Sequence, residues 1–311
     1  MRMLLSSTLA TSSSPGYALL DSGDNEKLER YGDITVRRPD PQALWHKHLS
    51  QKIWNAADAV FSTTAKNVGW VYAQKIPERW QIDLSNLKFW IRPTSFKHTG
   101  LFPEQAPNWE WMSVKISAQR GSALGGTNPV RVLNLFGYTG GATLACAAAG
   151  AEVVHVDGSK VAIGWGRDNA ALSGLSDKPI RWILDDAVKF VEREVKRGRQ
   201  YDGIILDPPA FGHGPNKELW KIEEHLLPLL ALCKNVLSPT PLFFLLNGYA
   251  SGYSAIAYGN NLADLMKSFE GSMEIGELTI QEETGGRLLP CGIFARWSAE
   301  KQQCLRTFPL L

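Results

Sequence analysis

Beyond residue 129, short apolar runs alternate with longer amphipathic segments. The apolar runs predict buried strands, and the amphipathic segments predict helices with one face turned toward a core. Strands are expected at residues 130–135, 152–156, 180–184, 201–206 and 242–246. Helices are expected at residues 140–149, 159–173, 187–197, 217–237 and 254–268. Such alternation is typical of right-handed βαβ units, so it predicts an α/β fold with a mostly parallel, Rossmann-like sheet.

Two further strands are predicted at residues 274–279 and 293–297, with a short Gly-rich connection between them instead of a helix. A connection this short joins antiparallel strands. We therefore expect the sheet to close with an antiparallel hairpin, which places one antiparallel strand at its edge.

The first 128 residues have a different pattern. Short β-favouring pieces at 17–20, 34–37, 68–72 and 87–91 are separated by turn residues. Together with a helix near 42–61, they predict a small, mainly β N-terminal domain at residues 17–128, which ends in a Gly-rich linker. Residues 129–311 then form the larger domain. The Ser/Thr-rich residues 1–16 are expected to be a flexible start, with an organellar transit peptide as the alternative.

Composition narrows the class of protein. With 311 residues, 44% of them apolar, the chain can bury a core, which excludes a disordered or fibrous protein. Its four cysteines are widely spaced without a CxxC pair, so no metal site is expected. No apolar run approaches the roughly 20 residues of a membrane-spanning helix, so we expect a cytoplasmic protein without a membrane partner.

The net charge of +2 conceals an asymmetry along the chain. Residues 1–128 carry 15 Lys and Arg against 11 Asp and Glu, whereas the remainder carries 18 against 20. Seven of the 11 tryptophans also lie in the first part, where they are expected to fill the core of a small β domain. The basic N-terminal part is therefore the piece suited to an anionic substrate.

Glycines and acids follow the predicted strands of the larger domain at their carboxyl ends. The first strand leads into Gly137-Tyr138-Thr139-Gly140, where glycine lets the backbone turn tightly beside a ligand. The next three strands lead into Asp157-Gly158, Asp185-Asp186-Ala187 and Asp207-Pro208-Pro209-Ala210-Phe211. Because the carboxyl ends of parallel strands meet at one crevice, these residues predict a site for a nucleoside-containing cofactor, with Asp157 on the ribose hydroxyls.

These motifs resemble those of the class I S-adenosylmethionine-dependent methyltransferases. More narrowly, they resemble a bacterial 23S rRNA methyltransferase group with a Leu-Asn-x-Phe-x-Tyr-Thr-Gly turn and an Asp-Pro-Pro-x-Phe motif. Here the two motifs occupy residues 133–140 and 207–211. Residues 98–105 (HTGLFPEQ) resemble the short Gly-x-Phe-x-x-Gln hairpin that these enzymes place ahead of the catalytic domain. The resemblance extends from about residue 96 to residue 297.

The resemblance implies S-adenosylmethionine as the cofactor and ribosomal RNA as the partner. It implies cofactor contacts at the turn and at the strand ends, by Asn134, Phe136, Gly137, Tyr138, Thr139, Gly140, Asp157, Gly158, Asp185, Asp186, Ala187 and Asp207. It implies substrate contacts on the hairpin and on the acceptor loop, by Lys97, His98, Phe102, Gln105, Pro209 and Phe211.

The acceptor loop favours chemistry at a base nitrogen. Asp207 and the Pro208 carbonyl can accept hydrogen bonds from the polar edge of a base, and Phe211 can stack on its face. After the fifth strand, Asn247 stands where cytosine-C5 enzymes have a cysteine, and it resembles the asparagine of guanine-N7 enzymes. We therefore expect these four residues to be catalytic in the methylation of a ring or exocyclic nitrogen of an rRNA base, with guanine favoured.

Several alternatives stay open at this point. The chain lacks the arginines that often follow the glutamine of the hairpin, which makes a protein or small-molecule substrate the alternative. The remaining candidates for phosphate contacts are Arg92, Lys97 and His98 on the hairpin, Arg37 and Arg38 upstream, and Lys115 and Arg120 downstream. Cytosine-C5 methylation would need a thiolate nucleophile, which Cys291 at the start of the final strand could supply. A nicotinamide-dependent oxidoreductase is a further alternative on the same fold. The sequence does not indicate an oligomeric state.

Overall fold

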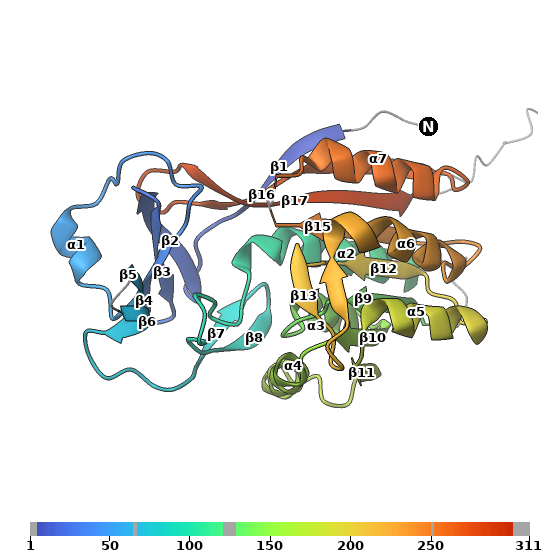
Figure 1. Cartoon of the computed structure of the whole chain (residues 1–311), viewed down its shortest axis with the longest axis horizontal. Coiled ribbons are helices and arrows are strands. Elements are labelled where there is room, and N and C mark those ends of the chain that lie inside the picture. Colours follow the sequence, from blue (N-terminus) through green and yellow to red (C-terminus); the bar gives the residue numbers. More distant parts are fainter. Residues whose placement is uncertain (1–4, 65–66, 121–128, 250–251, 301–311) are drawn as a thin grey trace, which may run out of the picture.

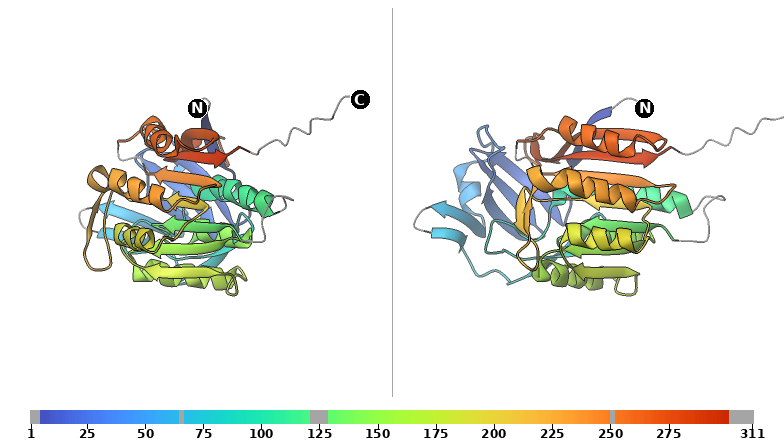
Figure 2. Two further views of the ribbon diagram at one scale, coloured as in Figure 1. Left: turned by 90° about the vertical axis from the view of Figure 1, so that its right-hand side faces the viewer. Right: turned by 45° about the vertical axis from the view of Figure 1, so that its right-hand side comes forward.

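Figure 1 shows the computed structural model of the chain, which describes residues 5–64, 67–120, 129–249 and 252–300. A mainly β N-terminal part lies beside a larger α/β part, and two long strands extend from one part into the other. The views in Figure 2 show helices on both faces of the larger sheet. The predicted linker at 121–128 lies outside the described residues.

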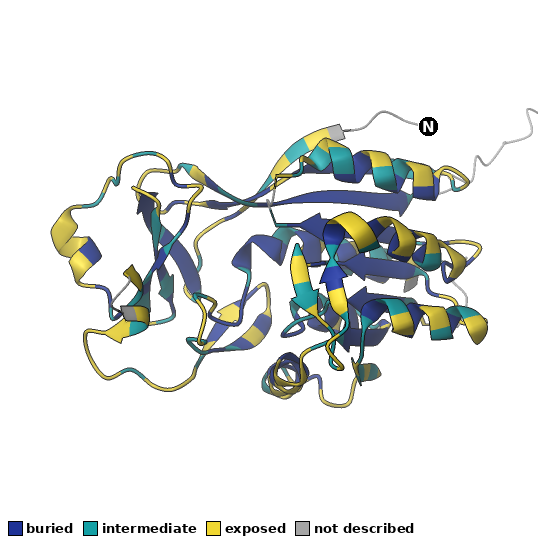
Figure 3. Ribbon diagram, viewed as in Figure 1, coloured by how far each residue is buried: buried dark blue, intermediate teal, exposed yellow. Residues whose placement is uncertain are grey.

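In the described part of the chain, the main sheet has eight strands in the order β1-β16-β17-β15-β12-β9-β10-β11. Their bounds are Leu5–Thr11, Gly271–Gln281, Leu288–Ala299, Phe243–Gly248, Gly203–Leu206, Arg131–Leu135, Glu152–Asp157 and Ile180–Leu184, in that order. From β15 to β11 all neighbours pair in parallel, which confirms the predicted α/β fold. β12 and β15 are buried along their whole length because helices cover both faces (Figure 3).

The helices of the larger part lie close to their predicted positions. They are α3 (Gly141–Ala148), α4 (Lys160–Leu172), α5 (Ala187–Lys196), α6 (Ile222–Asn235) and α7 (Ala255–Met266). α6 begins later than predicted, because β13 (Phe211–His213) and β14 (Leu219–Lys221) pair as a small antiparallel hairpin before it. α5, α6 and α7 pack along one face of the sheet, whereas α3 packs against α2 (Ala106–Arg120) on the other.

The sequence predicted an antiparallel strand at the edge of the sheet, but the antiparallel strand of the structure lies inside the sheet. β17 lies between β15 and β16 and pairs antiparallel with both. The edge strand is β1, which pairs in parallel with β16. The prediction of a flexible start is therefore wrong for residues 5–11. Their backbone groups complete a sheet whose next strand comes from near the other end of the chain.

The N-terminal part contains a five-stranded sheet and a separate hairpin, which confirms its mainly β character. The sheet consists of β2 (Tyr17–Gly23), β3 (Glu26–Tyr31), β4 (Ile34–Pro39), β5 (Ala59–Thr64) and β6 (Asn67–Tyr72), and the hairpin of β7 (Trp80–Leu84) and β8 (Leu87–Ile91). The helix predicted near 42–61 is present but much shorter, because α1 covers only Gln51–Asn55 and the residues of β5 pair with β4 and β6.

The segment before α2 is not the hairpin that the resemblance implied. Pro103–Gln105 forms a 3₁₀ turn, η1, which continues into α2. Proline is favoured at the start of a helical turn because its fixed φ suits the turn. The backbone N–H that it lacks would have no hydrogen-bond acceptor within the helix at this position. Gly100, with φ of 92°, lies so close to α4 that a side chain would meet the Trp165 ring. The segment is therefore packed firmly between the two parts of the molecule.

One hydrophobic core crosses from the N-terminal part into the main sheet, and it includes Tyr17, Phe89, Trp109, Val132 and Leu144. Polar contacts add to it: the buried Asp21 of β2 accepts a hydrogen bond from Trp54 and forms an ion pair with Arg287 between β16 and β17. These contacts hold the N-terminal part over the carboxyl ends of the parallel strands. No helix among the described residues is both long and apolar enough to cross a membrane.

Candidate active site

The turn after β9 lies across the end of β10. Phe136, Tyr138 and Gly140 have positive φ angles of 58°, 48° and 92°. The Gly137 N–H donates to a β10 carbonyl over 3.0 Å, and the Tyr138 N–H donates to Oδ2 of Asp157 over 2.8 Å. Left-handed backbone is unfavourable for residues other than glycine, so these bonds give the turn one defined shape.

Asp157 is held at the end of β10 by backbone donors on both sides. Besides the bond from Tyr138, the Ser159 N–H donates to its Oδ1 over 2.7 Å. Burial raises the pKa of Asp157, and the two hydrogen bonds oppose that shift. Each carboxylate oxygen retains a second lone pair, so Asp157 can also accept hydrogen bonds from two ligand hydroxyls.

A cavity of about 610 Å³, which we call the active-site cavity, opens beside Asp157. One wall comes from the strand ends and the residues after them: Phe136, Tyr138, Asp157, Gly158, Asp185, Asp186, Ala187, Asp207 and Pro209. The opposite wall comes from the N-terminal part and the segment before α2: Lys27, Arg38, Lys97, His98, Phe102 and Glu104. Its size suits a small-molecule ligand, and it lies where open α/β sheets bind their ligands.

The two acids after β11 have local partners as well as a place on the cavity wall. Asp186 caps α5 by accepting a hydrogen bond from the Lys189 N–H over 2.9 Å. Asp185 forms an ion pair with Arg193. Asp157 and Asp186 make this wall acidic, which favours a ligand that carries a positive charge, whereas Arg193 balances the charge of Asp185.

Asp207 follows β12 at the other end of the acidic wall. Its Oδ2 accepts a hydrogen bond of 3.4 Å from the Tyr249 hydroxyl, whereas its buried Oδ1 has no partner among the described residues. Burial and the nearby Glu104 carboxyl raise the pKa of Asp207 to about 7, and burial raises the pKa of Glu104 to about 7. Near neutral pH each of these two carboxyls is therefore divided between its protonated and its ionised form.

A buried chain of hydrogen bonds leads from the Tyr249 hydroxyl to the other face of the sheet. Tyr249 accepts from Gln105, whose Oε1 in turn accepts from Asn108, each over 3.1 Å. Asn108 also donates to Asn247 and accepts from Arg296, again over 3.1 Å. Asn247 is 2% exposed and is not among the residues that line the active-site cavity. Its hydrogen bond with Asn108 joins the end of β15 to α2.

Seven of the predicted cofactor residues line a smaller pocket behind the turn, and four of them do not also line the active-site cavity: Asn134, Gly137, Thr139 and Gly140. Asn134 donates to the Thr143 hydroxyl over 2.9 Å, and the Thr139 hydroxyl donates to the Gly100 carbonyl over 2.6 Å. A Cβ at Gly137 would lie 2.4 Å from the His155 ring. These residues shape and support the turn, whereas the remaining predicted cofactor residues line the active-site cavity.

Phe211 does not line the active-site cavity. It lies on β13 with 58% of its surface exposed, and its ring packs edge-on against His213. Pro208 is buried, whereas Pro209 and His213 line the cavity. Stacking of Phe211 on a substrate base therefore stays a prediction.

Two of the candidate phosphate contacts are already paired with acids. Arg37 forms an ion pair with Glu26 over 2.8 Å, and the buried Arg38 forms one with Glu29 over 2.6 Å. Their charges are neutralised within the N-terminal part, so the structure does not support their assignment to phosphate. Lys97, in contrast, forms no ion pair with any described residue and lines the active-site cavity.

Cys291 also lines the active-site cavity, near Glu104 and Tyr249. Its thiol donates to the Leu289 carbonyl over 3.4 Å. Burial and the carboxyl of Glu104 raise the pKa of Cys291 well above its ordinary value. The thiol is therefore protonated near neutral pH, and a protonated thiol is a poor nucleophile.

Sequence reasoning did not identify Glu104, Tyr249, Asn108 or Arg296 as members of this site. Glu104 lies within the segment 98–105 that carried the resemblance, and Tyr249 lies two residues beyond Asn247. The sequence held a signal for each residue: Glu104 is part of a motif, and Tyr249 lies shortly after a predicted strand. The contact between Asn108 and Arg296 has no local signal, because α2 and β17 are far apart in the chain.

Residues 62–238 match the family model described as S-adenosylmethionine-dependent methyltransferase. The ribosomal RNA large subunit methyltransferase K/L of Shewanella baltica (strain OS195) is 31% identical over 214 residues, which are 64% of this chain and 28% of that protein. The chain thus corresponds to a minor part of such relatives. The SAM-dependent methyltransferase of Agrobacterium tumefaciens is 40% identical, with a TM-score of 0.88 over 96% of both chains. The M. jannaschii tRNA m1G37 methyltransferase, 12% identical with a TM-score of 0.52 over 88% of this chain and 72% of its own, shares the fold.

Proposed function

The chain belongs to the family of S-adenosylmethionine-dependent methyltransferases, and we propose that it methylates a nitrogen of a ribosomal RNA base, with guanine favoured. One observation carries the assignment of the acceptor end. Asp207 lines the same cavity as Asp157, and its buried Oδ1 has no partner among the described residues. A buried acceptor without a donor is costly, so it fits a site that a donor from the substrate completes.

The residues of the acidic wall fit the proposed cofactor. S-adenosylmethionine, when bound, supplies a methyl group on a positively charged sulfonium. Asp157 would accept hydrogen bonds from the ribose hydroxyls, and Asp186 would lie at the adenine end. The carboxylates of Asp157 and Asp186 would favour the cation over a neutral ligand. The turn from Phe136 to Gly140 would enclose the methionine end.

Asp207 and Glu104 would orient the acceptor and receive its proton. An N–H of the base can donate to Oδ1 of Asp207, which sets the direction of the attacking nitrogen. Transfer of the methyl group to this nitrogen, with the sulfonium sulfur as the leaving group, would place positive charge on the nitrogen. A proton on N1 or on an exocyclic amino nitrogen can then pass to an ionised carboxyl of Asp207 or Glu104, whereas N7 carries no proton and the methylated base would keep its charge. Positioning of the two reactants supplies most of the rate in such a transfer.

Nitrogen is favoured over C5 of cytosine because carbon methylation needs a thiolate to attack the ring first. Among the described residues that line the active-site cavity, Cys291 is the thiol, and its raised pKa keeps it protonated. The choice of guanine rests on the resemblance of Asn247 to the asparagine of guanine-N7 enzymes, although Asn247 lines the smaller pocket behind the turn and not the active-site cavity. The choice of ribosomal RNA is supported by the names of the K/L relatives.

The test incubates the full chain with methyl-labelled S-adenosylmethionine and ribosomal RNA from cells that lack this protein. We expect one methylated guanosine in the nuclease digest, identified by mass spectrometry. Asp207→Asn should remove the label, and Asp264→Asn on the exposed side of α7 is the matched control. Label that resists ribonuclease but not protease would indicate a protein substrate, and absence of label from every RNA fraction would reject the proposal.

A further inference from the structure

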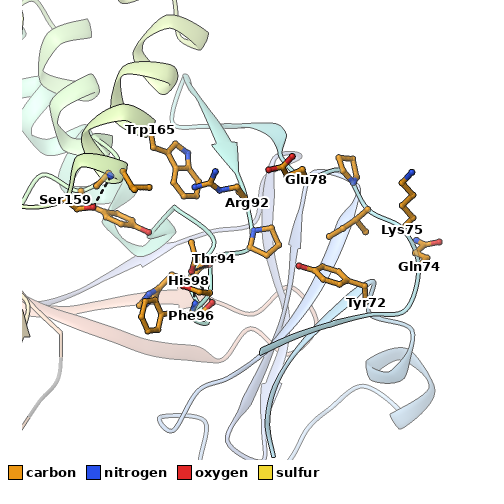
Figure 4. Close-up of a pocket in the computed structure, with 17 residues that line it drawn as sticks. Tyr72, Gln74, Lys75, Glu78, Arg92, Thr94, Phe96, His98, Ser159 and Trp165 are labelled. Carbon is orange, nitrogen blue, oxygen red and sulfur yellow. Dashed lines mark hydrogen bonds between the residues drawn. The ribbon is translucent and has the colours of Figure 1, made fainter. Parts of the chain in front are cut away.

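A second cavity of about 810 Å³, which we call the side cavity, adjoins the active-site cavity. Its residues come from the end of β6 and the loop after it, from residues 92–98, and from the first turn of α4 (Figure 4). His98, Tyr138 and Ser159 line both cavities, so the two are contiguous. A polymeric substrate with its reactive unit in the active-site cavity would therefore place a neighbouring unit in the side cavity.

Aromatic rings in the side cavity are exposed to solvent although their backbone is held firmly. Phe96 is 69% exposed and Tyr72 is 49% exposed. The Trp70 indole donates to the Thr94 and Phe96 carbonyls over 2.8 and 3.1 Å, and the Thr94 hydroxyl donates to the His98 carbonyl over 2.9 Å. These bonds fix the loop that presents the Phe96 ring. A fixed, exposed ring is a preformed platform on which another flat ring can stack.

The cations of the side cavity are available for a ligand. The Arg92 guanidinium lies over the Trp165 ring at 4.8 Å, and neither Arg92 nor Lys75 forms an ion pair with any described residue. Figure 4 shows Arg92 beside Trp165 toward α4, and Lys75 near Tyr72 at the other end. Glu78 is the acid among the residues that line the cavity, so the lining has a surplus of positive charge. That surplus is complementary to phosphate.

We propose that the side cavity binds single-stranded RNA next to the acceptor base, with a base stacked on Phe96 or Tyr72 and phosphates near Lys75 and Arg92. This inference rests on the proposed function for the class of substrate. Exposed rings combined with unpaired cations fit a nucleotide, which offers a flat base and a phosphate together. A paired A-form strand would hide the faces of its bases, so the strand must be open at this point.

Direct binding of a short, fluorescently labelled single-stranded RNA to the full chain, with S-adenosylhomocysteine present, tests the inference without requiring turnover. Phe96→Leu retains an apolar side chain but removes the aromatic ring, so we expect affinity to fall at least about fivefold. Phe96→Trp should restore it. Lys75→Ala should lower the slope of log affinity against log salt by about 0.7, which is the value for one phosphate contact on a single strand.

Leu227→Ala is the control, because Leu227 is 62% exposed on α6 and lies outside both cavities. Equal RNA affinity of Phe96→Leu and the unmodified chain would overturn the inference, even if ribosomal RNA is methylated. An equal loss of RNA affinity in Leu227→Ala would also overturn it. The same holds if Phe96 is needed for binding of a ribosomal protein and not for binding of RNA. Loss of RNA binding in Phe96→Leu without any rRNA methylation would reject the proposed reaction while supporting the side cavity as an RNA site.

Discussion

The backbone N–H of Tyr138 donates to Oδ2 of Asp157 over 2.8 Å, so the turn after β9 and the end of β10 form one hydrogen-bonded unit. The same carboxylate therefore supports the shape of the turn and presents its remaining lone pairs to the active-site cavity. Replacing Asp157 by alanine removes both the support of the turn and the acceptors for a ligand, whereas replacing it by asparagine keeps one oxygen acceptor.

Asp157→Ala should weaken S-adenosylmethionine binding by about 10- to 100-fold, because it removes the acceptors for the ribose hydroxyls and for the turn. Asp157→Asn keeps one oxygen acceptor and should lose less affinity. Titration calorimetry measures both, and Asp264→Ala on α7 controls for the loss of an exposed carboxylate. Unchanged affinity in Asp157→Ala would contradict the cofactor assignment.

Turnover should rise with pH through about 7 and level off above it, because the acceptor end needs an ionised carboxyl and the pKa values of Asp207 and Glu104 are both about 7. Glu104→Gln removes one of the two like charges, so the pKa of Asp207 falls and the rise should move to lower pH. The measurement is kcat against pH at saturating cofactor. A rise at the same pH in both proteins would show that the two carboxyls are not coupled.

Glu104→Gln should also alter how stability depends on pH. The pKa of Glu104 rises from an ordinary 4.5 to about 7 on folding, so the folded state binds the extra proton between these values. The free energy of unfolding of the natural chain should fall as pH increases from 4.5 to 7, and the variant should lack this part of the decline. Above pH 7 the variant should be more stable by about 1–3 kcal/mol. Urea unfolding at pH 5 and pH 8 checks this, and equal pH dependence would contradict it.

Gly137→Ala should destabilise the fold by about 1–3 kcal/mol, because the added Cβ would lie 2.4 Å from the buried His155 ring. Gly164→Ala in α4 is the matched control. A Cβ there meets no neighbouring atom within 4 Å, so alanine should stabilise the helix by about 0.5–1 kcal/mol. Urea unfolding at one pH compares the two variants, and a neutral Gly137→Ala would show that the turn relaxes easily.

Cys291→Ser should retain nearly full activity, because a protonated thiol makes no covalent contribution to transfer onto nitrogen. Steady-state methylation of ribosomal RNA by the variant and by the unmodified chain gives the comparison. A loss of activity by about 100-fold or more, which is the size expected for loss of a nucleophile, would instead support covalent attack on cytosine.

Local pattern was sufficient for the parts of the fold that depend on neighbouring residues. The bounds of β8 and β11 match their predictions, because each is a short apolar run flanked by turn residues. The acids Asp157 and Asp207 were identified for the same reason, since a strand end is a local feature. The helix predicted near 42–61 runs into the first three residues of β5, because a short apolar segment suits either structure until its pairing with β4 and β6 is known.

The sequence by itself determined the order of the βαβ units and the residues that follow each strand, because the periods of helix and strand are properties of nearby positions. The tertiary structure alone decided that β1 completes the sheet, that β17 lies inside it, and that Glu104 lies near Asp207. It also decided that Arg37 and Arg38 are neutralised while Arg92 and Lys75 are not. Each of these depends on contacts between segments distant in the chain, and the free energy of such contacts is set by burial and charge, which no local pattern contains.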